Sequence, residues 1–589
     1  MSTNDRPIIF IVSEEAGLGN KLGGISDVVH SEAKTIVKFQ KRQKTKFSSY
    51  VVGPIFKGLN DWNPQKRVTR ISELESTSIE PQIKTAIDRL QSDGVEVHYG
   101  EKDGINYLLL GTDHYETDHV KTETETLSKG DHIKAEAFKL VHLQSDKFDW
   151  MDYGKEFSHY LYFSHAVSEL ARTIDNISLH LHEFPTFYAG ARLKQKHIPC
   201  RVLATFHATV PGRAEGIHSL ETIKKGREAK INESDNWPKG IREGLAQLEL
   251  LGKYADAQTF VGNQTRAEAY TYYGINGKVI RNGIEVTTKE INWKRKEKYN
   301  RYIRHWLAEN IYEFVGGEKL NTEAILPWYT VSRIEIKNKG FHTLCDALVL
   351  RDIDLKNRIL EGEVPEDTRI IFFLVAAEGR KDPTALPEGF PLIYGPDTLL
   401  GRESILYHEY IKKKHLDIES LIAGKRKVAA VLYPQWICAK DGGLGLSVNE
   451  LAAGAIGGVF PSYYEPFLLT APATGAQGTP CIVSRACGVS DAILDYRRMK
   501  GDRKRGGMYL VDNLAQTELE TAMDIAVKMR TIDEAYQLNR PKFENLCQES
   551  IDVAKTLTWK EPTEEYLGLL LGEPSSSFSD DCGIPAASQ

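Results

Sequence analysis

The sequence predicts an α/β protein made of two doubly wound halves that face a central cleft, and three observations support this fold class. Short β-prone runs alternate with longer helical stretches, which is typical of parallel sheets with helices on both faces. The chain has 589 residues, which is too long for one hydrophobic core. Residues 287–320 form a charged stretch with several aromatics, and this stretch separates two sets of predicted strands.

The first half, residues 1–286, is predicted to hold a sheet whose strands each end near a Gly, Pro, His or polar turn. Asn4, Asp5 and Arg6 precede the first apolar run, so we interpret the N-terminus as a strand and not as a signal peptide. The predicted strands are Ile8–Val12, Ser49–Val52, Tyr107–Leu110, Ser178–His182, Arg201–Thr205, Ala257–Phe260 and Lys278–Ile280.

The second half, residues 326–545, is predicted to follow a bridge of helices over residues 287–325. Residues 572–589 are rich in Ser, Asp, Gly and Pro and are predicted to be disordered. The predicted strands of the second half are Trp328–Val331, Arg369–Val375, Val428–Leu432, Gly458–Pro461, Pro480–Ser484 and Gly507–Val511.

Composition argues against several classes of partner. The net charge is −6 and the isoelectric point is near 6.3, which gives no electrostatic reason to expect nucleic acid or an anionic membrane. No apolar run reaches the ~20 residues that span a bilayer. None of the seven cysteines forms a Cys-x-x-Cys pair. We therefore expect reduced thiols in a cytoplasmic protein and no zinc site.

The run from Gly457 to Pro466 ends an apolar strand in a turn that presents Glu465. A helix is predicted from about Leu468 to the Gly478-Thr479-Pro480 break. In open α/β sheets, ligands bind outside the carboxyl ends of the strands. A carboxylate beside a helix N-terminus suits a sugar hydroxyl together with a nucleotide phosphate. The alternative is a Glu-Pro turn that only ends an ordinary strand.

Two further segments of the first half combine small or polar residues with strand ends. Lys21, Gly23 and Gly24 follow the first strand, where paired glycines allow backbone N–H groups to approach a phosphate. An ordinary Gly-Gly turn before a helix is the alternative. Asn282-Gly283 indicates a strand-to-turn step, because Asn-Gly is favoured where φ is positive, and Asn282 could also address a ligand hydroxyl.

Histidines close two neighbouring predicted strands. Alternation along a strand puts His180 and His182 on one face. No third metal ligand has a recognisable spacing, so we prefer a hydrogen bond from His182 to a bound sugar over a metal site. A satisfied turn histidine is the alternative. The next strand end adds His207 and, six residues later, Arg213.

Residues 333–340, Arg-Ile-Glu-Ile-Lys-Asn-Lys-Gly, open the second half and lead into a predicted helix from Phe341 to Leu350. Arg333 and Lys339 can supply the positive charge that a diphosphate leaving group needs, because preorganised cations stabilise phosphoryl oxygens that gain charge. The alternative is a solvated basic turn.

Taken in order from about Phe10 to Leu570, these segments resemble the glycogen synthases of the animal and fungal type, which are retaining glycosyltransferases of the GT-B fold. That fold consists of two Rossmann-like domains. The resemblance implies an acceptor-side domain over 1–286, a nucleotide-sugar domain over 326–545 and a C-terminal helix, 546–571, that returns to the first domain. It is carried by Asn20-Lys21-x-Gly23-Gly24-Ile25, His180-x-His182-Glu183, Thr205-x-His207-Ala208-Thr209-x-x-Gly212-Arg213, Asn282-Gly283, Arg333-x-Glu335-x-x-Asn338-Lys339-Gly340, the run from Gly458 to Pro466, and Trp559-Lys560 with Glu565-Tyr566.

The resemblance also implies roles for single residues. His182 would lie near the transferred glucose, Glu465 would contact the sugar hydroxyls, and Arg333 with Lys339 would hold the diphosphate. These four are the expected catalytic residues, with no metal and no organic cofactor. The family uses no obvious protein nucleophile, and the resemblance implies that the leaving diphosphate would help to deprotonate the incoming hydroxyl on the same face. The expected substrate-binding residues are Lys21, Gly23, Gly24, His207, Arg213, Asn282, Tyr464 and Thr470.

Departures from the family pattern keep alternatives open. Where the family has a second glutamate, eight positions after Glu465, this chain has Ala473, and Leu468 replaces a usual glycine. The arginine-dense helix that senses glucose 6-phosphate is not evident near the C-terminus.

We expect transfer of glucose from UDP-glucose to the non-reducing end of an α-1,4-glucan. The alternatives are a retaining transferase with another nucleotide sugar or a small acceptor, and a catalytically weak binding or regulatory relative. A homo-oligomer is one alternative for the assembly.

Overall fold

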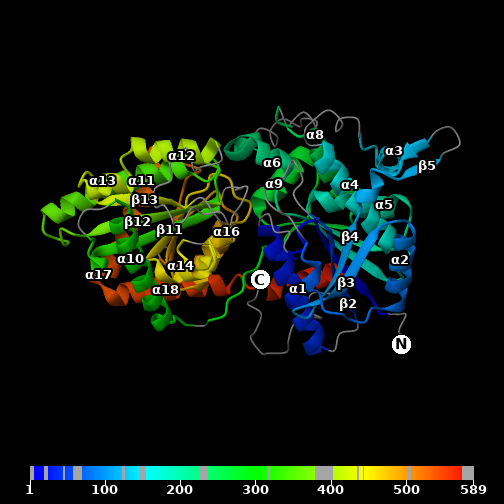
Figure 1. Ribbon diagram of the computed structural model, residues 1–589, viewed down its shortest axis with the longest axis horizontal. Coiled ribbons are helices and arrows are strands. Elements are labelled where there is room, and N and C mark those ends of the chain that lie inside the picture. The colour runs from blue at the N-terminus through cyan, green and yellow to red at the C-terminus, as the bar shows by residue number, and fades with distance from the viewer. Residues whose placement is uncertain are drawn as a thin grey trace. The chain divides into compact units, whose positions relative to one another are not determined.

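The computed structural model describes residues 6–18, 24–43, 47–57, 69–121, 126–144, 154–223, 237–239, 241–288, 290–315, 319–377, 402–433, 437–441, 443–501 and 506–573. These residues form two compact units (Figure 1). Unit 1 comprises Met1–Gly283 with Trp559–Gln589, and unit 2 comprises Ile284–Thr558. Lys21, Gly23 and all but the first two residues of the predicted tail 572–589 lie outside the described residues.

Unit 1 is built on an eight-stranded sheet in the order β10-β9-β8-β7-β1-β2-β4-β3. Its central strands β1 and β7 are buried on both faces; β1 is a nearly continuous apolar run, whereas β7 alternates apolar residues with Ser178, His180 and His182. The strands are β1 (Ile8–Ser13), β2 (Ser48–Pro54), β3 (Glu96–Lys102), β4 (Ile105–Gly111), β7 (Ile177–His182), β8 (Arg201–Phe206), β9 (Ala257–Phe260) and β10 (Lys278–Val279). All strands predicted from the sequence in this half are present.

The expectation of a purely parallel sheet is wrong at one edge. Strand β3 pairs antiparallel with β4, and the other pairings in the sheet are parallel. The sequence did not reveal β3, because this edge strand carries Glu96, His98, Glu101 and Lys102 and has no apolar run. A second short antiparallel pair, β5 (His119–Lys121) with β6 (Thr126–Ser128), was also missed.

Helices connect the strands of unit 1 and bury their apolar faces against the sheet. In α1 (Gly24–Gln43), the side chains of Val28, Val29, Ala33 and Ile36 are buried at helical spacing. The other helices are α2 (Pro81–Ser92), α3 (Lys129–Val141), α4 (Gly154–Ala171), α5 (Phe184–Gln195), α6 (Val210–Glu215), α8 (Glu243–Leu250), α9 (Asn263–Tyr273) and α19 (Lys560–Leu571).

Unit 2 has a six-stranded, wholly parallel sheet in the order β13-β12-β11-β14-β15-β16. This is the doubly wound order 3-2-1-4-5-6, and it reverses between β11 and β14. The strands are β11 (Ile325–Arg333), β12 (Arg369–Ala377), β13 (Val428–Tyr433), β14 (Gly457–Phe460), β15 (Cys481–Ser484) and β16 (Met508–Val511), which confirms those predicted from the sequence.

The helices of unit 2 include the charged segment that separates the two sets of strands. It forms α10 (Trp293–Val315), whose Ile303, Leu307 and Ile311 are buried at a spacing of four residues. The remaining helices are α11 (Phe341–Leu360), α12 (Arg402–Lys413), α13 (Ile418–Ile422), α14 (Val448–Gly454), α15 (Thr470–Ala476), α16 (Val489–Met499), α17 (Glu518–Leu538) and α18 (Arg540–Lys555). No helix in the described ranges is both long enough and apolar enough to cross a bilayer.

A buried polar cluster ties three elements of unit 2 together. Asp533 of α17 accepts a hydrogen bond from Trp328 Nε1 of β11 at 2.9 Å and one from Arg351 of α11 at 2.6 Å. All three side chains are almost fully buried. Because a buried charge is tolerated only with partners, this cluster fixes how α11 and α17 pack on the sheet.

Candidate active site

The predicted histidines of unit 1 lie where the strand order of its sheet reverses. After β1 the chain places β2 and β4 on one side, and later places β7, β8, β9 and β10 on the other. His182, the last residue of β7, is paired in register with Ser13, the last residue of β1. Ligands of doubly wound sheets bind outside the carboxyl ends of the strands at such a reversal.

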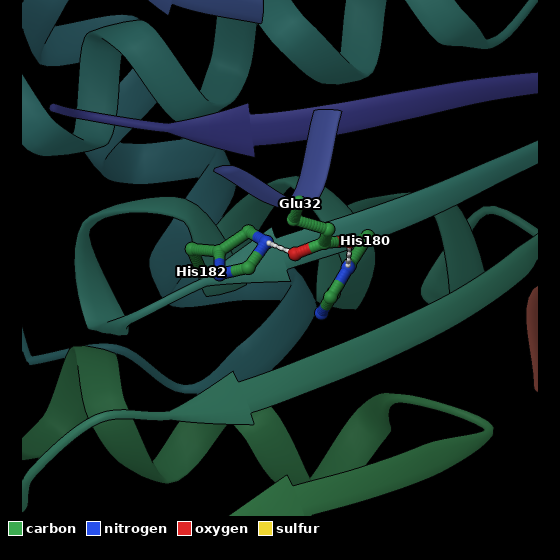
Figure 2. Close-up of side chains that lie close together, drawn as sticks. All are labelled: Glu32, His180 and His182. Carbon is green, nitrogen blue, oxygen red and sulfur yellow. Dashed lines mark hydrogen bonds and ion pairs between the residues drawn. The ribbon is translucent and has the colours of Figure 1, made fainter. Parts of the chain in front are cut away.

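Two histidines of β7 share one buried carboxylate (Figure 2). Nδ1 of His180 lies 2.7 Å from Oε1 of Glu32, and Nε2 of His182 lies 3.2 Å from Oε2 of the same side chain. The ring centroids of His180 and His182 are 4.0 Å apart, which confirms that both point to one face of the sheet. Glu32 comes from α1 and is fully buried.

The environment sets the charge states of this cluster. Burial alone would raise the pKa of the Glu32 carboxyl, but His180 and His182 outweigh burial and lower it to about 2. Burial and the neighbouring His180 lower the pKa of His182 to about 4, against the opposing effect of Glu32. At neutral pH the carboxylate is therefore ionised and His182 is neutral.

His207 extends the cluster to the next strand. Its Nε2 lies 3.0 Å from Nδ1 of His182, and the two rings are stacked. Burial and the two other histidines lower the pKa of His207 well below its ordinary value. The sequence prediction that His182 and His207 would lie at adjacent strand ends is thus realised as direct contact.

Glu183 holds the loop after β8 in place. It has φ = 70°, an uncommon value for a residue other than glycine, and its Oε2 accepts a hydrogen bond from the backbone N–H of His207 at 2.9 Å. Burial raises the pKa of Glu183, against the opposing effect of Arg213 on α6. Nη2 of Arg213 lies 3.8 Å from Oε1 of Glu183, and about half of the arginine side chain is exposed.

The remaining predicted residues of unit 1 are less tightly gathered. Gly24 is the exposed first residue of α1. Asn282 is buried, and its Oδ1 has no hydrogen-bond partner among the described residues. The expected positive φ at Asn282-Gly283 is wrong, since neither residue has one. Gly283 is required for a different reason: a Cβ there would lie 2.6 Å from the backbone nitrogen of Trp559.

In unit 2, the predicted cations and the predicted carboxylate flank the reversal between β11 and β14. Lys339 is buried, and its Nζ forms an ion pair with Glu465. Arg333, the last residue of β11, has a mostly exposed side chain whose Nη2 lies 3.2 Å from Oε1 of Glu335. Each cation is thus already next to a carboxylate.

Backbone contacts lock the two loops of this reversal together. The carbonyl of Asn338 accepts hydrogen bonds from the N–H groups of Tyr463 at 2.7 Å and Tyr464 at 3.2 Å. Gly340 has φ = 66°, and a Cβ on it would lie 2.3 Å from the carbonyl oxygen of Pro461. Glycine is therefore needed where α11 begins.

The predicted helix after Glu465 is present as α15, shorter than expected at its N-terminus. Thr470 is its first residue, and the buried Oγ1 of Thr470 has no hydrogen-bond partner among the described residues. Leu468 adopts φ = 76°, a left-handed conformation that favours glycine. Ala473 lies within α15 and is partly exposed.

Glu32, His180 and His182 are also the group of described side chains that could hold a metal ion, since their ligand atoms lie within 4.8 Å of one another. Sequence spacing gave no third ligand, and α1 supplies one. However, both histidines already contact the carboxylate oxygens directly, and all three side chains are fully buried. The hydrogen bond between His180 Nδ1 and Glu32 Oε1 occupies two of the possible ligand atoms, whereas Oε2 of Glu32 and Nε2 of His182 have no hydrogen-bond partner among the described residues.

The sequence reasoning missed Glu32, although a signal was present. Glu32 lies on the same helical stripe as Val28, Val29 and Ile36, so it is a carboxylate on the apolar face of an amphipathic helix. Charged residues are almost never fully buried unless they are paired. A charge at such a position therefore indicates a buried partner.

Comparison with known proteins decides the family. A family model described as Glycogen synthase matches residues 12–381 and 411–568.

The chain belongs to the glycogen synthase family.

Full-length relatives are distant but cover most of the chain. The glycogen synthase isoform 2 of Saccharomyces cerevisiae is 22% identical over 93% of this chain and 84% of its own length. The liver glycogen synthase of Mus musculus is 20% identical over 86% of this chain and 75% of its own length. The resemblance to the animal and fungal glycogen synthases is therefore confirmed.

Solved structures confirm the GT-B fold class. The catalytic domain of starch synthase IV from Arabidopsis thaliana, bound to ADP and acarbose, aligns with a TM-score of 0.54 and 14% identity, covering 97% of this chain and 99% of that one. A UDP-forming α,α-trehalose-phosphate synthase from Burkholderia vietnamiensis aligns with a TM-score of 0.51 and 11% identity, covering 96% and 100%.

Proposed function

We propose that this member of the glycogen synthase family is a retaining glucosyltransferase that moves glucose from UDP-glucose to the non-reducing end of an α-1,4-glucan. The observation that carries the proposal is the family match over residues 12–381 and 411–568. The reaction needs a donor, an acceptor and a leaving diphosphate, and the proposal assigns side chains of this chain to each of them.

Unit 2 is assigned the nucleotide sugar. Arg333 and Lys339 lie at the carboxyl end of β11 and just before the N-terminus of α11, a 20-residue helix. Two cations beside a helix N-terminus suit a diphosphate. Glu465, which already contacts Lys339, is assigned to the sugar hydroxyls. When the diphosphate arrives, we propose that Lys339 stabilises its developing charge while Glu465 keeps the ammonium group in place.

Unit 1 is assigned the acceptor and the transferred glucose. His182 is the last residue of β7, His207 directly follows β8, and Arg213 lies close by on α6. The low pKa of His182 favours a neutral ring that can exchange hydrogen bonds with sugar hydroxyls. Gly24 and Asn282 complete the assigned residues of unit 1 among those described, and Tyr464 and Thr470 are assigned to the donor.

A different donor is the second candidate, and Ala473 is the observation that favours it. An alanine on α15 cannot accept a hydrogen bond from a sugar or ribose hydroxyl, so contacts that the family makes with a glutamate there are missing. ADP-glucose or another nucleotide sugar is therefore the alternative substrate. A binding role without catalysis is the third candidate, and the retained His182, Arg333, Lys339 and Glu465 argue against it.

The deciding experiment measures release of nucleoside diphosphate from UDP-glucose and from ADP-glucose, each with and without glycogen. We expect UDP release that depends on glycogen. Release from ADP-glucose alone would move the assignment to the other donor. Release that does not depend on glycogen would argue against a glucan as the acceptor. Release from neither donor would favour a binding role. The proposal places this reaction in the cytosol, where cysteines stay reduced.

A further inference from the structure

Glu32 is a buried charge that none of the assigned roles uses. Its side chain is fully buried, and an isolated carboxylate in such a place would be strongly destabilising. It is stabilised by a hydrogen bond from His180 Nδ1 at 2.7 Å and by an electrostatic contact of its Oε2 with His182 Nε2 at 3.2 Å, which lacks hydrogen-bond geometry. Because a carboxylate can only accept hydrogen bonds and repels a bare ring nitrogen, Glu32 favours a proton on Nδ1 of His180 and on Nε2 of His182, the two nitrogens that face it.

One arm of the cluster, from Glu32 through His180 and Thr205 to Thr259, can be assigned a single direction of hydrogen-bond donation. Nδ1 of His180 donates to Glu32, which leaves Nε2 to face Oγ1 of Thr205 at 2.7 Å. Thr205 Oγ1 in turn lies 2.7 Å from Oγ1 of Thr259. With the hydroxyls of Thr259 and Thr205 as successive donors, every group in this arm has a partner. The ring of Tyr566 packs on His180 with the centroids 4.6 Å apart.

The His182 arm leads from Glu32 toward the assigned sugar site. Nε2 of His182 faces Glu32, so the neutral ring has its bare nitrogen at Nδ1, where His207 Nε2 lies 3.0 Å away. His207 must then donate from Nε2, which leaves Nδ1 as the acceptor nitrogen of that ring. A single carboxylate thus fixes the tautomer of His182 directly and that of His207 through it.

We propose that Glu32 is a positioning residue for glucosyl transfer, which holds His182 and, through it, His207 in the Nε2–H tautomer and in fixed ring orientations. The inference rests on the proposed function for its effect on turnover, whereas the tautomers follow from the cluster itself. Charged or titratable groups that face the two rings are Glu32, His180 and Arg213, as their influence on the pKa values of His182 and His207 indicates.

Glu32→Gln is the informative variant because the amide has nearly the same shape. Its oxygen can accept from His180, but its NH2 group must then face His182 and needs an acceptor there. His182 would take the Nδ1–H tautomer, donate to His207 and turn that ring into an Nδ1–H tautomer as well. Glu32→Asp keeps an acceptor-only group and preserves the tautomers.

Glu136 offers a matched control in the same unit. Its carboxyl also has a pKa lowered to about 2, against the effect of burial, and its Oε2 lies 3.5 Å from Nδ1 of His165. Glu136 pairs with Arg192 of α5 and has no assigned role in transfer. Glu136→Gln therefore reproduces the loss of a partly buried carboxylate beside a histidine without altering His182.

Two readouts test the inference. In 15N spectra of wild-type protein labelled at the histidine ring nitrogens, we expect neutral His182 and His207 with protonated Nε2, assigned by comparison with His182→Gln and His207→Gln proteins. In Glu32→Gln both should change to protonated Nδ1. Kinetically, Glu32→Gln should lower kcat on the order of 100-fold with a small change in KM, the loss typical of a misplaced group near the reacting atoms. Glu32→Asp should recover part of kcat.

Three results would overturn the inference. The first is a wild-type spectrum with His182 protonated at Nδ1, a result that needs no variant to fold and no activity. The second is an equal loss of kcat in Glu32→Gln and Glu136→Gln, which would make Glu32 merely structural. The third is one equivalent of metal in the purified wild-type protein that is lost in Glu32→Gln. If wild type lacks transferase activity, the proposed function fails while the spectra still decide the tautomers.

Discussion

Replacing Lys339 by methionine tests the assigned diphosphate site most directly. The side chain of Lys339 is 9% exposed, so its ammonium group has few alternatives to its ion pair with Glu465, which is 22% exposed. Methionine keeps the length and much of the volume of lysine and removes only the charge. The variant therefore separates packing from electrostatics.

The expected magnitudes differ for turnover and for folding. Loss of one preorganised donor that stabilises transition-state charge typically reduces kcat by about 100- to 1,000-fold, or about 3–4 kcal/mol. Removal of the cation also leaves the Glu465 carboxylate without its partner, which costs about 1–3 kcal/mol when the group is buried. Since Glu465 keeps some contact with water, we expect Lys339→Met to lower the free energy of unfolding by about 1 kcal/mol, near the lower end of that range.

The assay combines UDP release at saturating glycogen with urea unfolding of the same preparations. Lys414→Met is the matched control, because Nζ of Lys414 forms a 2.6 Å ion pair with Asp346 on the surface of unit 2. Such exposed pairs contribute about 0–1 kcal/mol, so turnover should stay at the wild-type level. The double variant Lys339→Met/Glu465→Gln removes both charges and should recover stability without recovering kcat.

One outcome refutes the reasoning. If Lys339→Met is folded at the assay temperature and retains kcat within about threefold of wild type, Lys339 does not stabilise the leaving group. A fall in kcat of equal size in Lys414→Met would instead indicate a general effect of charge on unit 2.

Three further predictions concern folding. Gly340→Ala should destabilise unit 2 by more than about 2 kcal/mol in urea unfolding, because the new Cβ combines φ = 66° with a contact of 2.3 Å to Pro461 O; an unchanged midpoint would contradict this. Asp533→Ala should lower the free energy of unfolding by about 3 kcal/mol or more, since it leaves Arg351 and Trp328 Nε1 without their shared acceptor; a loss under 1 kcal/mol would count against it. Stability should fall as the pH falls from about 6.5 to 4, because the pKa of His182 is lowered to about 4 and only the unfolded chain takes up its proton in that window. The loss between pH 7 and pH 5 attributable to this group is about 2 kcal/mol, and His182→Gln should reduce the acid sensitivity by that amount; an identical pH dependence in both proteins would contradict the assignment.

Local patterns in the sequence determined the fold class and several parts of the candidate site. Strand runs such as Ile8–Ser13 and Val428–Tyr433 are apolar because parallel strands are buried on both faces, and this signal is independent of strand order. The sequence also identified strand-end residues such as His182 and Arg333 as candidate site residues, since ligand sites of doubly wound sheets lie at the carboxyl ends of the strands. By contrast, β3 was not predicted from the sequence, because an edge strand needs no apolar run.

Only the tertiary structure decided which of these residues meet. Glu32 and His180 are 148 positions apart, and they come together because the sheet places β7 beside β1 with α1 packed nearby. Gly283 shows the same limit, since its dipeptide indicated a turn, whereas the approach of Trp559 is what requires glycine. Sequence periodicity indicates which side chains of a segment are buried. The partner that a buried group finds depends on strand order and long-range packing, which no local pattern encodes.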